Sequence, residues 1–218
     1  MRIHPLSISG AWRVSAEPHG DPRGLFLEWF RSDRLAELLG HSVGFDQGNL
    51  SVSNRGVIRG VHFADVPPGQ AKYVSCIRGA VLDVVVDLRL GSPTFGRWEG
   101  VRLDDVERTA VYLSEGLGHG FCALTEEATV MYLCSTTYNP EREHAINPCD
   151  AALGIAWPAA DPIVSPRDLA APSLDEVRER GLLPFYRACI AYAEARRTSS
   201  DSLPSGARTV SGSPPRRT

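Results

Sequence analysis

Residues 80–89 read Ala-Val-Leu-Asp-Val-Val-Val-Asp-Leu-Arg and predict a long β-strand near the middle of the chain. Because side chains alternate between the two faces of a strand, Val81, Asp83, Val85 and Asp87 share one face. The opposite face carries only aliphatic side chains, from residue 82 to residue 88.

Six further stretches with strand character flank it on both sides. They are residues 57–63, 71–77, 97–103, 109–113, 120–125 and 128–136. Glycine and proline occur between them, as in Pro67-Pro68-Gly69 and Gly91-Ser92-Pro93, and mark turns. Many short strands separated by turns indicate an all-β core, either a sandwich, a jelly roll or a barrel.

Helical signals are few and lie outside this strand-rich region. One helix is predicted over residues 33–39 after a Ser32 N-cap, and another over 174–180 after a capping box of Ser173 and Glu176. A third is predicted from residue 184 to about residue 197. The last stretch is rich in Ser, Pro, Gly and Arg, so we expect one domain over residues 1–197 and a disordered tail over 198–218.

Composition and charge exclude several classes of protein. The 218 residues are 43% hydrophobic, with a formal net charge of −3, so the chain has no general basic field for nucleic acid. Its apolar runs are too short to span a bilayer, and the N-terminus lacks the apolar core of a signal peptide. The five cysteines are odd in number and have no CxxC spacing, so we expect reduced thiols and a cytoplasmic protein.

The first group of reactive residues is Arg59-Gly60-Val61-His62. In a regular strand Arg59 and His62 point to opposite faces, because they are three residues apart. A bulge at Gly60 would turn both inward. A histidine there suits a general base, and a structural or surface histidine is the alternative.

Three other residues have both a chemical and a structural interpretation. Lys72 shares a face with Val74 and Cys76, so it is either a functional lysine among buried residues or an edge-strand lysine. His119 has a glycine on each side, which permits either close approach of a ligand or a turn. Tyr132 either donates a proton or packs in the core. The six histidines are scattered with no HxH pair, so we predict no metal site.

These residues belong to longer motifs that stand in order along the chain. The motifs are GVIRGVHF (56–63), QAKYV (70–74), DVVVDLR (83–89), GSPTFGRW (91–98), EGLGHGF (115–121) and IAWP (155–158). Together they resemble the dTDP-4-dehydrorhamnose 3,5-epimerase family over nearly all of residues 10–184. The resemblance implies a cupin-type jelly-roll barrel with a few peripheral helices, and a homodimer. It also implies no metal or organic cofactor, and a dTDP-4-keto-6-deoxyhexose substrate.

The resemblance also implies roles for particular residues. His62 would accept a proton, Tyr132 would donate one, Asp168 would pair with His62, and Lys72 would lie near the ketone oxygen. The other residues that it places around the nucleotide sugar are Arg23, Glu28, Gln47, Asn49, Arg59, His119, Tyr138, Glu143 and Arg167.

The leading hypothesis is epimerisation of dTDP-4-dehydro-6-deoxy-D-glucose at carbons 3 and 5 to dTDP-4-dehydro-L-rhamnose. A mono-epimerase of natural-product deoxysugar biosynthesis, a non-catalytic nucleotide-sugar-binding cupin and a metal-dependent cupin stay open as alternatives. The chain departs from the family pattern at Leu133, which follows Tyr132 where a lysine is frequent. It also has Gly48 between Gln47 and Asn49, and Arg167 in place of a lysine.

Overall fold

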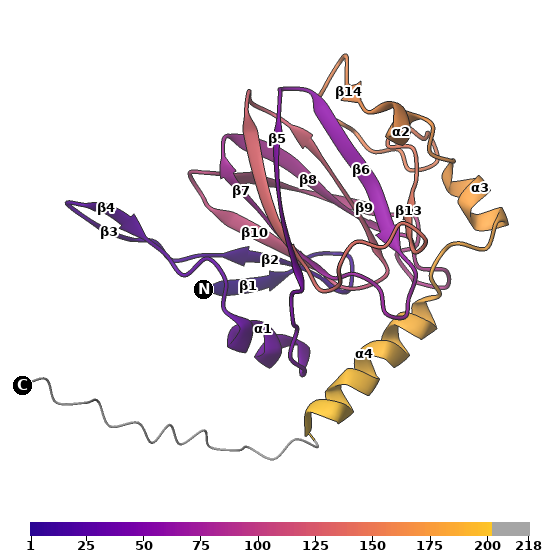
Figure 1. Cartoon of the computed structure of the whole chain (residues 1–218), viewed down its shortest axis with the longest axis horizontal. Helices are drawn as coiled ribbons and strands as arrows, with labels where there is room; N and C mark the ends of the chain where they lie inside the picture. Colours follow the sequence, from indigo (N-terminus) through magenta and orange to yellow (C-terminus); the bar gives the residue numbers. More distant parts are fainter. Residues whose placement is uncertain (202–218) are drawn as a thin grey trace, which may run out of the picture.

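The computed structural model describes residues 1–201, and two antiparallel sheets packed face to face form its centre (Figure 1). Across the first sheet the order is β1 (Arg2–Pro5), β2 (Ala11–Ser15), β10 (Thr109–Leu113), β7 (Lys72–Arg78), β12 (Ala128–Cys134) and β5 (Gln47–Ser53). Across the second it is β13 (Glu143–Ala145), β6 (Val57–Ala64), β11 (Leu117–Ala123), β8 (Ala80–Asp87) and β9 (Trp98–Asp104), with β14 (Ile163–Val164) parallel to β6. Most neighbours in a sheet are distant in sequence, as in a jelly roll.

The peripheral elements are one hairpin and four helices. The hairpin pairs β3 (His19–Asp21) with β4 (Gly24–Phe26) and projects from the body of the molecule (Figure 1). The helices are α1 (Ser32–Leu39), α2 (Pro166–Leu169), α3 (Leu174–Glu179) and α4 (Tyr186–Asp201). The predicted all-β jelly-roll core with a few peripheral helices is therefore confirmed.

Strand β8 has apolar residues on both of its faces because each face packs against an apolar cluster. Val81 and Val85 lie in the apolar core between the two sheets. Val84 and Val86 lie in a second apolar cluster, which includes residues from the segment 146–183. This segment covers the outer face of the second sheet, so neither face of β8 meets water.

The strand predictions hold for the long middle strands and fail at two places. The stretch predicted over 120–125 is β11, which begins earlier, at Leu117. Gly118 and Gly120 lie inside this strand, where a side chain would meet Leu88 or the Arg59 carbonyl oxygen, whereas they resemble turn signals in the sequence. The short strands β1–β4, β13 and β14 were not predicted, because they have little apolar alternation. The seven-residue strand β5 was also not predicted: only Leu50 and Val52 are large and apolar in it.

Two of the predicted helix boundaries can be checked against capping contacts. The capping box of α3 is present: the Ser173 hydroxyl accepts from the Glu176 N–H, and the Glu176 side chain accepts from the Ser173 N–H. At α1 the predicted N-cap is wrong by one residue. Arg31 holds the N-cap position and Ser32 is the first helical residue, while Gly40 ends the helix in the left-handed conformation.

Helix α4 attaches the C-terminal part of the described chain to the barrel. Arg196 forms an ion pair with buried Glu115 at 2.6 Å, and the Arg197 Nε donates to the Leu39 carbonyl oxygen at 2.7 Å. The helix extends to Asp201, so residues 198–201 of the predicted tail are helical. Residues 202–218 of that prediction lie outside the described residues.

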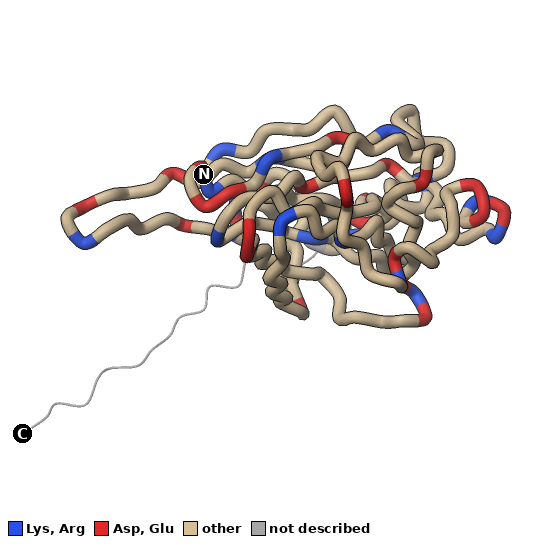
Figure 2. The backbone as a smooth tube through the Cα atoms, turned by 90° about the horizontal axis from the view of Figure 1, so that it is seen from above, with Lys and Arg blue, Asp and Glu red and all other residues tan. Residues whose placement is uncertain are grey.

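Charged residues of both signs are interspersed along the described chain, as Figure 2 shows. The projecting hairpin carries both signs, with Asp21 and Arg23 forming an ion pair at its turn.

Candidate active site

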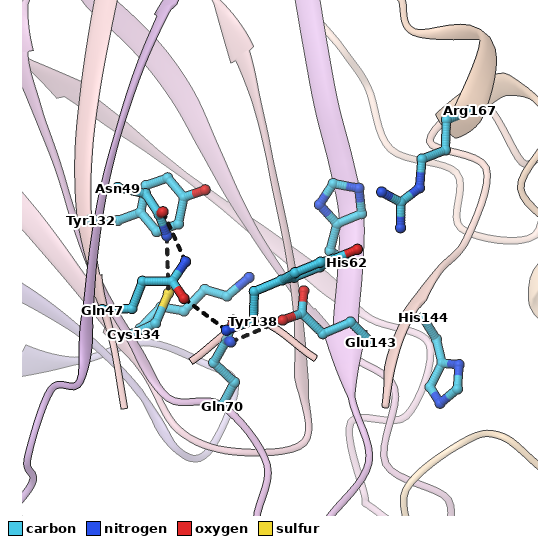
Figure 3. A pocket seen from close by; sticks show the side chains of 11 residues that line it. Gln47, Asn49, His62, Gln70, Tyr132, Cys134, Tyr138, Glu143, His144 and Arg167 are labelled. Carbon is cyan, nitrogen blue, oxygen red and sulfur yellow. Dashed lines mark hydrogen bonds between the residues drawn. The ribbon is translucent and has the colours of Figure 1, made fainter. Parts of the chain in front are cut away.

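A cavity of about 380 Å³ opens between the two sheets and gathers most of the predicted site residues (Figure 3). The predicted residues that line it are Gln47, Asn49, His62, Lys72, Tyr132, Tyr138, Glu143 and Arg167. Gln70, Cys134 and His144 also line it and were not predicted.

One wall of the cavity is built by three neighbouring strands of the first sheet. In their register, Cys134 of β12 lies between Lys72 of β7 and Gln47 of β5. Two residues back along β12, Tyr132 pairs with Asn49 of β5. Because residues two apart in a strand share a face, these five side chains project into the same space.

The opposite wall depends on a bulge in β6. Between the pairings of Arg59 and His62 with β11, strand β6 has one residue more than its partner. Gly60 lies in this interval with φ +115°, a conformation that favours glycine. His62 then lines the cavity, while the Arg59 Nε donates to the Ser53 hydroxyl on the first sheet at 3.1 Å. The predicted bulge is therefore present, but it brings only His62 into the cavity, and Arg59 is exposed outside the lining.

His62 and Asp168 form the pair that the family resemblance implied. The His62 Nε2 lies 2.9 Å from the Asp168 Oδ1, and the Ser165 hydroxyl accepts from the Asp168 N–H at the start of α2. Burial raises the pKa of Asp168, but the hydrogen bond and the charge of His62 outweigh it and hold this pKa below its usual value. The carboxylate is thus ionised beside the imidazole at neutral pH.

Lys72 is the buried cation of the cavity. Its side chain is 92% buried, and among residues 1–201 its ammonium group has no hydrogen bond or ion pair. Burial lowers the pKa of Lys72, and the surrounding Cys134, Glu143 and Asp83 oppose this effect. The amine is therefore unpaired and points into a space that a ligand can fill.

Tyr132 retains its proton at neutral pH. Burial raises the pKa of its phenol, and Cys134 and Glu143 raise it further, whereas Arg59 lowers it. A neutral phenol at this position is available as a proton donor.

Besides Asp168, which pairs with His62 but does not itself line the cavity, four other predicted residues lie outside the lining. His119 is buried opposite His62 in the pairing of β11 with β6, with its Nε2 2.7 Å from the Asp83 Oδ2. Arg59 bridges the two sheets, as described above. Arg23 and Glu28 lie on and after the projecting hairpin, where they pair with Asp21 and Arg31 of the same chain. Contact of these four residues with a substrate stays a prediction.

Of the three departures from the family pattern, only Arg167 contributes to the cavity wall. Leu133 lies on the opposite face of β12 from Tyr132 and packs in the cluster that contains Tyr73. Gly48 likewise faces away from the cavity between Gln47 and Asn49. Arg167 lines the cavity, and a hydrogen bond to the Tyr138 side chain raises the pKa of its guanidinium.

Two of the three lining residues that were not predicted had a signal in the sequence, and the third had none. Gln70 precedes Lys72 by two residues and Cys134 follows Tyr132 by two, so strand alternation places each beside a predicted residue. His144 has no such signal: it lies on the short strand β13, and its Nε2 is 2.7 Å from the Asp65 Oδ1.

Neither a metal-binding cluster nor a membrane-spanning helix is found in the described chain. Residues 1–201 contain no group of three or more His, Cys, Asp or Glu side chains placed to hold a metal ion. Over the same range no helix is both long and apolar enough to cross a membrane. All five cysteines, in contrast, are present as free thiols.

The fold and the cavity define the class of protein, a cupin-type isomerase. The family model for dTDP-4-dehydrorhamnose 3,5-epimerase matches residues 5–176. The chain is 60% identical over 191 residues to a dTDP-4-dehydrorhamnose 3-epimerase of Streptomyces niveus, covering 88% of this chain and 92% of the relative. It is 54% identical to a dTDP-4-dehydrorhamnose 3,5-epimerase of Mycolicibacterium smegmatis, covering 90% of this chain and 98% of that one.

A solved structure agrees with these sequence matches. ChmJ, a 3'-monoepimerase from Streptomyces bikiniensis in complex with dTDP-quinovose, superimposes with a TM-score of 0.87 at 52% identity, covering 89% of this chain and 99% of that one. The chain belongs to the dTDP-4-dehydrorhamnose 3,5-epimerase family.

Proposed function

We propose that the chain epimerises dTDP-4-dehydro-6-deoxy-D-glucose at carbons 3 and 5 and releases dTDP-4-dehydro-L-rhamnose. The observation that supports this most is the arrangement of the cavity. His62 enters it from β6 of one sheet and Tyr132 from β12 of the other, with Lys72 on the strand next to Tyr132. A base and an acid on opposite sides of a sugar are what inversion of a carbon requires.

The chemistry of the substrate explains these residue types. Carbons 3 and 5 flank the ketone at carbon 4, so their protons are acidified. In the proposed reaction His62 removes such a proton, the ammonium group of Lys72 stabilises the enolate oxygen, and Tyr132 returns a proton on the opposite face. Because Lys72 has no partner among the described residues, its charge is available to the enolate.

The proposed role of Asp168 follows from its geometry. An ionised carboxylate accepts the Nε2–H of His62, so the lone pair of the imidazole is at Nδ1. The same carboxylate stabilises the imidazolium that forms after proton abstraction. We propose Nδ1 as the atom that takes the proton.

The nucleotide diphosphate is proposed to bind at the arginines near the cavity. Arginine pairs with phosphate oxygens through two parallel hydrogen bonds, which suits Arg167 at the cavity and Arg59 at its side. Gln47, Asn49, Tyr138 and Glu143 would contact the rest of the ligand. His119, which pairs with His62 across the two strands, is also proposed as a ligand contact.

We further propose a homodimer in which Arg23 and Glu28 act in the cavity of the second copy. Both residues lie outside the cavity of their own chain, on and after a hairpin that projects from the barrel (Figure 1). The edge strand β5 exposes Leu50 and Val52 at 60% and 52% of their surface. An apolar edge strand is usually covered by a partner, and a second copy is the partner that we propose.

No cofactor is needed by this chemistry as proposed. The proton leaves and returns without a change in oxidation state, so neither an electron acceptor nor a redox metal participates. A cytoplasmic location is also proposed, supported by the five free thiols, which persist in a reducing compartment.

A second candidate is inversion at carbon 3 alone. The relative from Streptomyces niveus, 60% identical over 191 residues, is named a 3-epimerase, and ChmJ is a 3'-monoepimerase. The lining residues described above serve either reaction, since one base and one acid act at each carbon.

Incubation of the purified protein with dTDP-4-dehydro-6-deoxyglucose in heavy water tests both candidates. Two deuterons in the sugar, located by mass spectrometry, together with the L-rhamno configuration of the product, are expected for the 3,5-epimerase. One deuteron at carbon 3 would favour the mono-epimerase instead. Protein that binds dTDP without any exchange would contradict both and support a non-catalytic binding module.

A further inference from the structure

Cys134 is a buried thiol on the wall of the cavity that has no role in the proposed reaction so far. It is 99% buried, and among the cysteines only Cys134 is found lining this cavity. In the register of the first sheet it lies directly between Lys72 and Gln47, and it shares a face with Tyr132. It therefore stands among three side chains of the proposed site.

A chain of hydrogen bonds ends at this thiol (Figure 3). The backbone N–H of Tyr138 donates to the Gln47 Oε1 at 2.7 Å, and the Gln47 Nε2 donates to the Asn49 Oδ1 at 2.9 Å. The Asn49 Nδ2 then donates to the Cys134 Sγ at 3.7 Å. This series of hydrogen bonds starts at a backbone N–H, which can only donate. The donor and acceptor of each later hydrogen bond are therefore determined.

A thiol suits the end of this series of hydrogen bonds better than an apolar or a charged side chain would. An apolar side chain would leave the half-buried Asn49 amide without this acceptor. A carboxylate would accept the bond, but it would also pair with Lys72 and withdraw its charge from the substrate. A thiol is a weak acceptor, and burial raises its pKa, so at neutral pH it stays uncharged.

We propose that Cys134 is a positioning residue for the epimerisation: it orients the Asn49 amide in the substrate cavity while leaving the neighbouring Lys72 without an ionic partner. This inference rests on the proposed function, and it adds a residue to the site that acts through Asn49 rather than on the substrate.

Two substitutions separate the hydrogen bond from the packing. Cys134→Val fills a similar volume and suits a strand, but it removes the acceptor. Cys134→Ser keeps an acceptor. We expect Cys134→Val to lower kcat/KM about two- to tenfold, the worth of one hydrogen bond, and Cys134→Ser to restore most of this loss. Cys122→Val, a buried cysteine on β11 that does not line the cavity, is the matched control and is expected to retain wild-type kcat/KM.

A double-mutant cycle with Asn49 is the decisive measurement. If Cys134 acts through Asn49, adding Cys134→Val to Asn49→Ala lowers kcat/KM no further than Asn49→Ala alone. A fully multiplicative double mutant would overturn the inference, as would a Cys134→Val enzyme with wild-type kcat/KM. If Cys134→Val does not fold, as judged by its thermal transition, the same cycle is run with Cys134→Ala. Absence of deuterium exchange in the wild-type protein would overturn the proposed function instead.

Discussion

The partner of His62 is 106 residues away in the sequence, on the short helix α2, and yet it lies within hydrogen-bond distance. The position of His62 is determined by β6, and its tautomer by Asp168. The proton transfer that we propose for His62 thus depends on two elements that meet only after folding.

At the residue scale, His62→Ala is expected to abolish deuterium exchange while binding of dTDP survives. General acid–base catalysis contributes about 10²–10⁴-fold, so the loss should be of this size. Exchange is measured by mass spectrometry and binding by calorimetry. His4→Ala, an exposed histidine on β1, is the control and should exchange normally. Retained exchange in His62→Ala would remove His62 from the mechanism.

Lys72 gives a prediction about pH. Because burial lowers its pKa, Lys72 loses its proton at a lower pH than a free lysine does. If its ammonium form stabilises the enolate, kcat falls as pH rises through this lowered pKa. Lys72→Ala is expected to lower kcat by about 10²–10³-fold, more than it weakens binding, and to remove this alkaline limb from the pH profile. An effect confined to KM would instead make Lys72 a binding residue.

At the scale of the element, the bulge in β6 is the feature on which the site depends. A regular strand would turn either Arg59 or His62 out of the barrel. At Gly60 a Cβ would lie 2.6 Å from the Gly120 Cα and from the His119 carbonyl oxygen. Neither contact is the flexible end of a side chain, so the strands must shift to relieve it.

Gly60→Ala is therefore expected to lower both the free energy of unfolding and the activity. The positive φ alone costs about 1–3 kcal/mol, and the contact adds to it. Gly91→Ala is the matched control, since Gly91 has φ +85° but no atom within 4 Å of the position that its Cβ would take. Urea denaturation should show a larger loss for Gly60→Ala. Equal losses would mean that the close approach to β11 is unimportant.

At the scale of the whole molecule, the edge of the first sheet is the surface that we expect a second copy to cover. The double substitution Leu50→Lys and Val52→Lys places two charges on this edge strand. It should shift the molecular mass measured by light scattering towards that of the monomer. Val106→Lys, at a residue that is 78% exposed outside this strand, should leave the mass unchanged. If the β5 substitutions leave the molecular mass unchanged, the interface between the two copies lies elsewhere on the surface.

Mixed dimers test whether a site is shared between two copies. If Arg23 acts in the partner's cavity, mixing Arg23→Ala with His62→Ala chains regenerates one intact site in each hybrid dimer, or about a quarter of all sites. Mixing Lys72→Ala with His62→Ala should regenerate none, because both residues line the cavity of one chain. If the first mixture stays inactive, Arg23 acts within its own chain or not at all.

Several features of this protein follow from local sequence. The alternation in residues 80–89 and the turn residues around it predict the central strands, and Ser173 with Glu176 predicts the start of α3. The motif around Gly60 predicts the bulge, since only glycine tolerates the backbone there. These inferences succeed because each depends on neighbouring residues.

The sequence by itself determined the strand-rich core, the family and the identity of most lining residues, through periodicity and motifs that lie within a few positions of each other. Only the tertiary structure decided which of them meet. It placed Cys134 between Lys72 and Gln47, His119 beside Asp83, and Gly118 inside a strand. The physical reason is that pairing between strands far apart in sequence sets these neighbours, and no local pattern records that register.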